Sequence, residues 1–422
     1  MELRQRADQV VRPQGRIFYG WYIAGAAGGL QGISMLLWMQ SYGAYVVLLQ
    51  EEFGWGKAWL AGAFAMTRIE SGVLGPLQGW LTDRYGPRAI LRAGIFIFGI
   101  GFFLFSQVHN LLMFYIAFAL IAVGASFGGF ATVMVAIVNW FDRHRSKAIA
   151  FSLLGGSIGS LSVPIVFACL DFYGWRITAI MSGFLIIVLG LPLAQVVRHK
   201  PVLYGETADG IKLSGEAANQ KLIKKSPDFT AREAMRSRAF WLISIGHACS
   251  LLTVSAVMVH LVPHLTEGLN YSLKQAGYVV AFLAASQLVG QVVGGYLGDR
   301  FDKRLICTVC MVAHAVGIMS VTFANSLLMV IGFAIIYGVS WGVRGPNLVG
   351  LRADYFGTRS YGTIMGFSSL IAMFGMSIGP ILAGYLADVQ GHYELGFTLL
   401  AAGAFFGSFA FLAAIPPKRL VI

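Results

Sequence analysis

Residues 59–92 decide the fold, and they read WLAGAFAMTRIESGVLGPLQGWLTDRYGPRAILR. The stretch begins as an apolar run that contains two charged residues, Arg68 and Glu70, and it ends in the polar loop GWLTDRYGPR at Gly79–Arg88. A similar loop, GYLGDRFDKR, returns 216 residues later at Gly295–Arg304, about half the chain length away. A chain that repeats its most polar loop at half length is built from two similar halves.

The composition is that of a membrane protein. Hydrophobic residues make up 57% of the chain and charged residues 12%, whereas soluble domains carry roughly 25% charged residues. Between the charge clusters lie apolar runs long enough to cross a hydrocarbon core of roughly 30 Å. The runs cover residues 20–47, 58–82, 93–109, 111–139, 148–170, 177–197, 239–265, 275–298, 305–324, 327–351, 360–387 and 396–416. We therefore expect an all-α membrane protein with twelve transmembrane helices in two pseudo-symmetric six-helix bundles.

The net charge of +12 follows from membrane topology and does not indicate nucleic-acid binding. Of the 31 Lys and Arg residues, 26 fall on one side of the predicted spans, three fall on the other side and two lie within spans. Cytoplasmic loops carry such an excess of basic residues, so both termini are expected in the cytoplasm. The segment before the first run is polar and has no apolar core of a signal peptide. We expect a multi-pass protein of the cell (inner or plasma) membrane, in contact with the lipid bilayer and with no nucleic-acid partner.

Landmarks of the first half recur in the second half at a steady offset of 215 to 217 residues. The pairs are Glu52 and Glu267, Ala61-Gly62 and Ala276-Gly277, Phe141 and Phe356, Pro164 and Pro380, and Asp171 and Asp388. A constant offset over so many positions indicates duplication. The predicted organisation is a first bundle over residues 1–197, a polar cytoplasmic linker over 198–238 and a second bundle over 239–422.

The sequence lacks the patterns of an enzyme or a metal site. The four cysteines lie in apolar runs, and Cys307 and Cys310 form a CxxC pair without a second pair to complete a metal site. No phosphate-cradling loop and no nucleophile with a suitably spaced base is present. We therefore expect no cofactor, no metal and no enzymatic or ATP-driven activity.

The paired GxxxDRxGxR-type loops, in a chain of six plus six spans around a cytoplasmic linker, resemble the major facilitator superfamily over essentially the whole chain. More narrowly, Trp140-Phe141-x-Arg143-x-Arg145, followed by Ala148 and by Gly155-x-Ser157-x-Gly159, is similar to the monocarboxylate porter and oxalate–formate antiporter branch. Gly20-Trp21 at the start of the first run agrees with it. The resemblance implies transport of small organic anions, often together with protons.

The resemblance also implies that the charged loops latch the two halves in one access state; their residues are Asp83, Arg84, Arg88, Asp299 and Arg300. Anchoring of the topology by positive charge alone is the alternative. The chain departs from the branch in one respect. Runs 20–47 and 275–298 contain no Lys, Arg, Asp or Glu, although the branch often places a cationic residue in the eighth span.

Arg344 is the predicted substrate ligand. It lies ten residues before Asp354, at the cytoplasmic end of its span, and is therefore about 15 Å deep at helical rise, near the middle of the core. A guanidinium binds a carboxylate through two parallel hydrogen bonds. A structural ion pair between helices is the alternative.

Glu70 is the single carboxylate within the predicted spans and the candidate for proton coupling. It either titrates or neutralises Arg344. In the coupling hypothesis, an arriving anion takes Arg344 and leaves Glu70 unpaired, which raises the proton affinity of Glu70. Arg68 lies two residues earlier, roughly 200° around the helix, and is predicted to be a structural or gating residue.

Four further polar residues could line the substrate cavity: Gln40, His247, Gln287 and Gln291. His260 and His264 lie near the outer end of their span and are expected to be solvated. Competing functions are export or antiport of amphiphilic compounds, suggested by glycine and proline in runs 148–170 and 360–387, and a non-transporting receptor, which would need an effector domain. The sequence favours secondary active transport of a small, monocarboxylate-like organic anion by alternating access, coupled to protons in symport.

Overall fold

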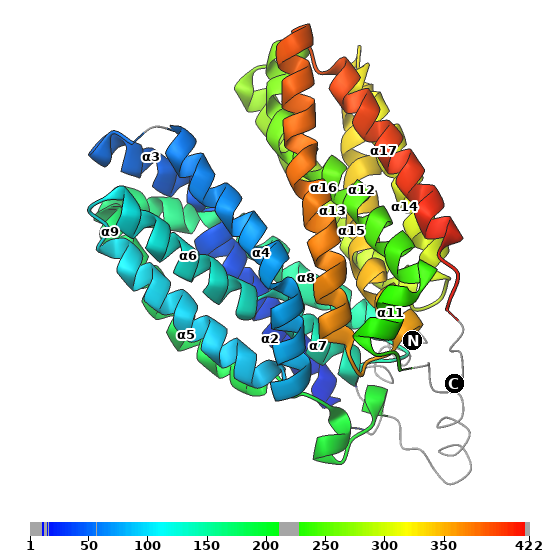
Figure 1. Ribbon diagram of the computed structural model, residues 1–422. Coiled ribbons are helices and arrows are strands. Elements are labelled where there is room, and N and C mark those ends of the chain that lie inside the picture. Colours follow the sequence, from blue (N-terminus) through cyan, green and yellow to red (C-terminus); the bar gives the residue numbers. More distant parts are fainter. Residues whose placement is uncertain (1–10, 12–14, 16, 56, 211–227, 418–422) are drawn as a thin grey trace. The chain divides into compact units, whose positions relative to one another are not determined.

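The computed structural model describes residues 11, 15, 17–55, 57–210 and 228–417. All regular secondary structure in this part of the chain is helical (Figure 1). The chain divides into two compact units. The first unit contains Met1–Lys225 together with Thr358–Gly366, and the second contains Ser226–Gly357 together with Phe367–Ile422.

The first unit is a bundle of helices. Its helices are α2 (Tyr19–Ser34), α3 (Tyr42–Phe53), α4 (Lys57–Tyr85), α5 (Pro87–Ser106), α6 (Leu111–Phe127), α7 (Phe130–Trp140), α8 (Arg145–Leu161) and α9 (Val163–Val196). A π-helical turn, Met35–Met39, separates α2 from α3. Helix α5 packs between α6 and α9, and α2 packs on α8. The interior contains a cluster of aromatic rings, among them Trp38, Phe102, Phe105 and Phe118.

The second unit is also helical and carries the C-terminal half of the chain. Its helices are α11 (Ala231–Arg236), α12 (Arg238–Pro263), α13 (Leu273–Gly298), α14 (Lys303–Thr322), α15 (Leu327–Phe356), most of α16 (Tyr361–Gln390) and α17 (Glu394–Ala413). Helix α15 packs against both α13 and α14, and α17 packs against α12 and α14. The first residues of α16, up to Gly366, belong to the first unit.

The expected spans correspond to observed helices. Ten helical stretches in the described residues are long and apolar enough to cross a membrane. One of them, Arg145–Val196, contains α8 and α9 and covers two expected runs. Helix α4, which carries Arg68 and Glu70, is not among the ten, but its 29 residues make it about 43 Å long. It covers the expected run 58–82.

Of three breaks in the helices of the first unit, two lie at glycines and only one coincides with a boundary between expected apolar runs. Gly174, with φ of 73°, interrupts α9 in the gap expected between runs 148–170 and 177–197. The first of these two runs is itself divided at Ser162, where α8 ends and α9 begins at Val163-Pro164. The run expected over 111–139 is broken at Gly128-Gly129, between α6 and α7. Apolar composition alone does not reveal such breaks, because the flanking residues stay hydrophobic.

Helices α2 and α8 are in backbone contact through glycines. A Cβ at Gly155 would meet the backbone of Gly28, and a Cβ at Gly159 would meet the backbone of Gly32. The Gly-x-Ser-x-Gly motif of α8 therefore has a packing role, since small residues allow two helices to approach closely. Beside this contact, the amide nitrogen of Gln31 donates to the hydroxyl of Ser152 at 2.5 Å.

The segment that follows α9 packs against the first unit, and we call residues 196–210 the clasp. The Arg198 guanidinium lies over the rings of Tyr19, at 3.7 Å, and Tyr204, at 4.3 Å. The indole of Trp140 donates to the Arg198 carbonyl at 3.1 Å. These contacts tie the end of α9 to the start of α2 and the end of α7.

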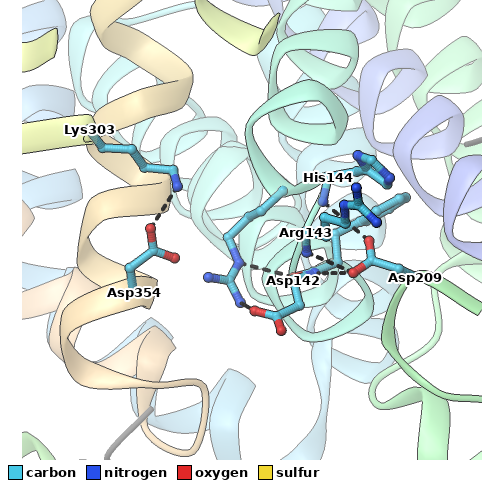
Figure 2. Close-up of polar contacts among 8 residues, drawn as sticks. Asp142, Arg143, His144, Asp209, Lys303 and Asp354 are labelled. Atoms are coloured by element: carbon cyan, nitrogen blue, oxygen red, sulfur yellow. Dashed lines mark hydrogen bonds and ion pairs between the residues drawn. The ribbon is translucent and has the colours of Figure 1, made fainter. Parts of the chain in front are cut away.

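The carboxylate of Asp209 completes the clasp (Figure 2). It accepts three successive backbone N–H groups, from Asp142 at 3.1 Å, Arg143 at 2.7 Å and His144 at 3.3 Å. These amides precede the N-terminus of α8, where a negative charge is favourable. Asp209 is 6% exposed and has φ of 59°, a left-handed conformation that aspartate tolerates better than most residues.

His199 of the clasp predicts a pH dependence of stability. Burial, with a further contribution from the charge of Lys200, lowers the pKa of His199 to about 4 from its ordinary 6.5. As pH falls through this interval, the unfolded chain binds a proton that the folded chain does not, so stability decreases. We expect the melting temperature to fall as pH drops from about 6.5 toward 4, and less steeply in His199→Gln. Parallel slopes in thermal unfolding of the two proteins in detergent would contradict this.

Candidate substrate-binding site

Arg344 lies inside the second unit, on α15. The residue is 3% exposed, and its Nε is enclosed without a hydrogen-bond partner. Within the described residues, no hydrogen bond or ion pair of Arg344 is found. A charged side chain in a membrane span costs at least ~2.5–3.5 kcal/mol on insertion scales. Such a cation is unfavourable unless an anion joins it.

Within the described part of the chain, the groups that interact electrostatically with Arg344 carry no negative charge. Cys307 and Cys310 on α14 and Tyr337 on α15 are close enough to interact with it electrostatically. His247 on α12 and His314 on α14 are also within electrostatic reach. The guanidinium is thus surrounded by neutral polar groups from three helices of one unit.

A second buried arginine, Arg352, lies eight residues further along α15 and was not singled out from the sequence. It is 2% exposed, donates to Nδ1 of His247 at 2.8 Å and donates to the hydroxyl of Ser368 at 3.1 Å. The Ser368 hydroxyl in turn accepts from Ser244 at 2.9 Å. Because an arginine only donates, Nδ1 of His247 must accept, and the ring proton therefore sits on Nε2. His247, a predicted lining residue, thus bonds Arg352, is within electrostatic reach of Arg344 and links α12 to α15.

The predicted glutamines on α13 lie near this cluster by backbone contact. A Cβ at Gly342 would meet the backbone of Gln287 and Gln291, so α13 and α15 touch two residues before Arg344. Gln291 is buried and Gln287 is partly buried. Gln40 is different, because it is exposed and caps the π-helical turn of the first unit.

Glu70 belongs to a polar cluster in the first unit. Its Oε2 accepts from Ser71 on α4 and Ser126 on α6, both at 3.3 Å, and its Oε1 is enclosed without a partner among the described residues. Gln78, about two turns further along α4, donates to the Ser126 carbonyl at 2.5 Å and to the hydroxyl of Thr132 on α7 at 3.0 Å. The cluster surrounds the break between α6 and α7. The side chain of Arg68 lies outside the described residues.

Two histidines of the outer region differ from expectation. His264 is buried, and its Nε2 donates to the Val321 carbonyl at 2.9 Å, so the prediction that it is solvated is wrong. His260 donates to the Pro380 carbonyl at 2.9 Å, and Pro380 lies in the middle of α16. This bond between a side chain of α12 and the backbone of α16 joins residues 120 apart, and the sequence pattern does not show it.

Asp83 caps the start of α16. Its carboxylate accepts the backbone N–H groups of Gly362 at 2.9 Å and Thr363 at 2.8 Å, and the Thr363 hydroxyl at 2.8 Å. A Cβ at Gly79 would meet the Gly362 backbone, so α4 and the start of α16 are also in direct contact. A carboxylate at a helix N-terminus is stabilised by the unpaired amides and the helix dipole.

The remaining loop residues have local contacts. Arg84 lies over Trp80 and Tyr85, Arg88 donates to the Val197 carbonyl at 2.8 Å, and Arg300 lies over Tyr296 at 4.0 Å. Asp299 is the C-cap of α13. In the second unit Lys303 forms an ion pair with Asp354 at 2.7 Å (Figure 2).

A family model matches nearly the whole chain, over residues 27–259 and 243–421, and its description is the Major Facilitator Superfamily. The chain belongs to this superfamily. Human monocarboxylate transporter 11 is 26% identical over 415 residues, which cover 93% of this chain and 82% of that protein. A probable L-galactonate transporter of Escherichia coli is 24% identical over 383 residues, which cover 86% of this chain and 82% of that protein.

The fold agrees with that of a solved transporter structure. The crystal structure of a bacterial homologue of the iron transporter ferroportin, in an outward-facing state, superposes with a TM-score of 0.73 at 16% identity, over 94% of this chain and 99% of that one. The predicted all-α fold of twelve helices in two bundles is thereby confirmed. As a Major Facilitator Superfamily protein, the chain is a multi-pass membrane transporter and not an enzyme.

Proposed function

We propose that this transporter is a secondary active carrier of small organic anions in the cell membrane, with both termini in the cytoplasm. The observation that supports it is Arg344, a buried arginine with no bonded partner in the described chain and with only neutral neighbours. A carboxylate is the complementary ligand, because it accepts two parallel N–H bonds from one guanidinium. Relatives named as monocarboxylate and L-galactonate transporters agree with this substrate class.

Arg352 supports the same proposal; it lies on α15 about two turns beyond Arg344. Its bonds to His247 and Ser368 fix a second cation in the same unit, at the helix face nearest α12. Two fixed positive charges make the region attractive to an anion, and the hydrogen bonds hold one of them in place before binding. Gln287 and Gln291 then offer amides beside the anion.

Counterflow in proteoliposomes tests the proposal. Vesicles that contain the purified protein are loaded with unlabelled lactate, pyruvate or L-galactonate, and the uptake of the same labelled acid is recorded. We expect transient accumulation of at least one label above its equilibrium level, because the loaded carrier exchanges substrate without a net driving force. Labelled glucose and a labelled organic cation serve as controls. Accumulation of these controls without any of the acids would overturn the proposal.

Asp83 is the proposed latch residue, and its carboxylate binds the start of α16.

Glu70 is the proposed proton-coupling carboxylate of the first unit. For Glu70→Gln we expect counterflow to persist while accumulation driven by an inward proton gradient falls, since glutamine cannot change charge. The measurement compares labelled-acid uptake with and without the gradient. As a matched control, Glu51→Gln makes the same substitution at an exposed carboxylate and should leave proton-driven accumulation unchanged. Undiminished proton-driven accumulation by Glu70→Gln would exclude the residue.

A further inference from the structure

His314 is a buried histidine that none of the contacts above employs. It is 0% exposed on α14, and both of its ring nitrogens are enclosed without a hydrogen-bond partner among the described residues. A neutral imidazole has one N–H donor and one acceptor nitrogen, and burial without partners is unfavourable for both. An unsatisfied polar side chain in a membrane span indicates a functional site.

The surroundings place His314 beside Arg344. Cys307, Cys310 and His314 occupy one face of α14 at i, i+3 and i+7, and all three are buried toward the helices of the unit. The ring of His314 stacks on Tyr337 of α15 with centroids 4.6 Å apart and planes at 26°. Tyr337 and Arg344 also share a face at i, i+7, and a helical side chain leans toward the N-terminus of its helix. Arg344 therefore extends toward Tyr337 and is within electrostatic reach of His314.

The charge around His314 is one-sided. From α15 it interacts with Arg344 and stacks on Tyr337. Of the other helices packed on α14, α17 carries a single titratable residue, Glu394 at its first position beside His392, and α13 carries Lys274, Tyr278 and Tyr296. No carboxylate occurs within the sequences of α13 or α14, so Arg344 supplies the dominant field.

We propose that His314 binds a proton together with the anion at Arg344, so that the second unit carries a proton of its own; this rests on the proposed function. In the empty site, the charge of Arg344 opposes a second positive charge on the imidazole. A bound carboxylate removes that opposition and offers an oxygen to the imidazolium N–H. Water on the side of entry supplies the proton, and His314 returns it to water on the side of release. Anion and proton then bind with positive and reciprocal coupling.

The proposal gives the transporter a proton in addition to any carried by Glu70. The ratio of protons to anions should therefore fall by one in a variant whose residue 314 cannot ionise. His314→Phe keeps a ring stacked on Tyr337, and His314→Gln keeps a donor and an acceptor without a titratable group. Arg344 still binds the anion in both variants and counterflow needs no net proton movement, so counterflow should persist, although His314→Phe weakens it by removing the N–H donor to the carboxylate. His392→Gln, at an exposed histidine, is the matched control.

The experiment uses proteoliposomes with the pH dye pyranine inside and labelled lactate, pyruvate or L-galactonate outside, whichever acid the wild type exchanges. The fluxes of protons and of the label together give the ratio. We expect a ratio lower by one in both His314 variants and an unchanged ratio in His392→Gln. An unchanged ratio in a His314 variant that retains counterflow overturns the proposal alone. Absence of counterflow of all three acids by the wild type overturns the proposed function as well.

A second measurement does not depend on folding of the His314 variants. Calorimetric titration of Glu70→Gln with the exchanged acid, in buffers of different ionisation enthalpy, reports the protons taken up on binding. Because His314 is intact in this protein, we expect close to one proton per anion bound at a pH above neutrality. Binding without proton uptake would overturn the proposal.

Discussion

Replacing Arg344 with glutamine should abolish anion counterflow and leave the protein folded. Each hydrogen bond to a charged group contributes ~1.5–3 kcal/mol, so loss of the two-bond fork lowers affinity by at least about tenfold per bond. Folding should not suffer, since the variant removes a buried charge that has no bonded partner in the described chain. Labelled-acid counterflow and the melting temperature in detergent measure the two effects.

Arg344→Lys should also lose most counterflow, because an ammonium is a point charge and cannot reproduce the planar fork. Arg232→Gln is the matched control, since Arg232 is exposed on α11. We expect this control to transport as the wild type does. Normal counterflow by Arg344→Gln would exclude Arg344 as the anion ligand.

A large effect on stability is expected at Gly155. A Cβ there would meet the O, C and Cα atoms of Gly28, and backbone atoms cannot rotate away as a side chain can. Overpacking of a tight contact costs typically 1–3 kcal/mol, and here α2 and α8 must separate along their length. We expect Gly155→Ala to lower the melting temperature and the yield of monodisperse protein.

The neighbouring glycine gives a matched control. A Cβ at Gly156 would make ordinary contacts, 3.6 Å from Cγ of Met35 and 3.9 Å from Cβ of Gln31. Gly156→Ala should therefore leave the melting temperature nearly unchanged. Helix propensity favours alanine over glycine at both positions and cannot account for a loss of stability. If the two substitutions destabilise equally, the contact of residue 155 with α2 is not the cause, and the packing interpretation fails.

The sequence predicted the fold well because a membrane span is determined by length and apolar composition, both of which are local. It also identified Arg344 as a charged residue inside a span. It missed Arg352, because the expected run was ended at residue 351, directly before this charge, although α15 continues to Phe356 and buries Arg352. A charged residue within one turn of a predicted helix end can therefore still be interior.

The partners of these residues could not be predicted, because they come from other helices. Ser126 binds Glu70 across 56 residues, and His247 binds Arg352 across 105. The sequence does hold one unused signal, the i, i+3, i+7 spacing of Cys307, Cys310 and His314 on an otherwise apolar run. The spacing shows a shared face, but only the structure shows that the face meets Arg344's helix.

The Asp209 carboxylate and its three amides have a practical consequence for dividing the polypeptide. Residues up to Gly210 are part of the first unit's packing, since Arg198, Tyr204 and Asp209 all bind to it. A two-plasmid version of the transporter should therefore begin its second open reading frame after Gly210. An N-terminal fragment that stops at Val197 would leave Trp140 and the amides before α8 without their partners, and we expect such a fragment to be degraded in the host.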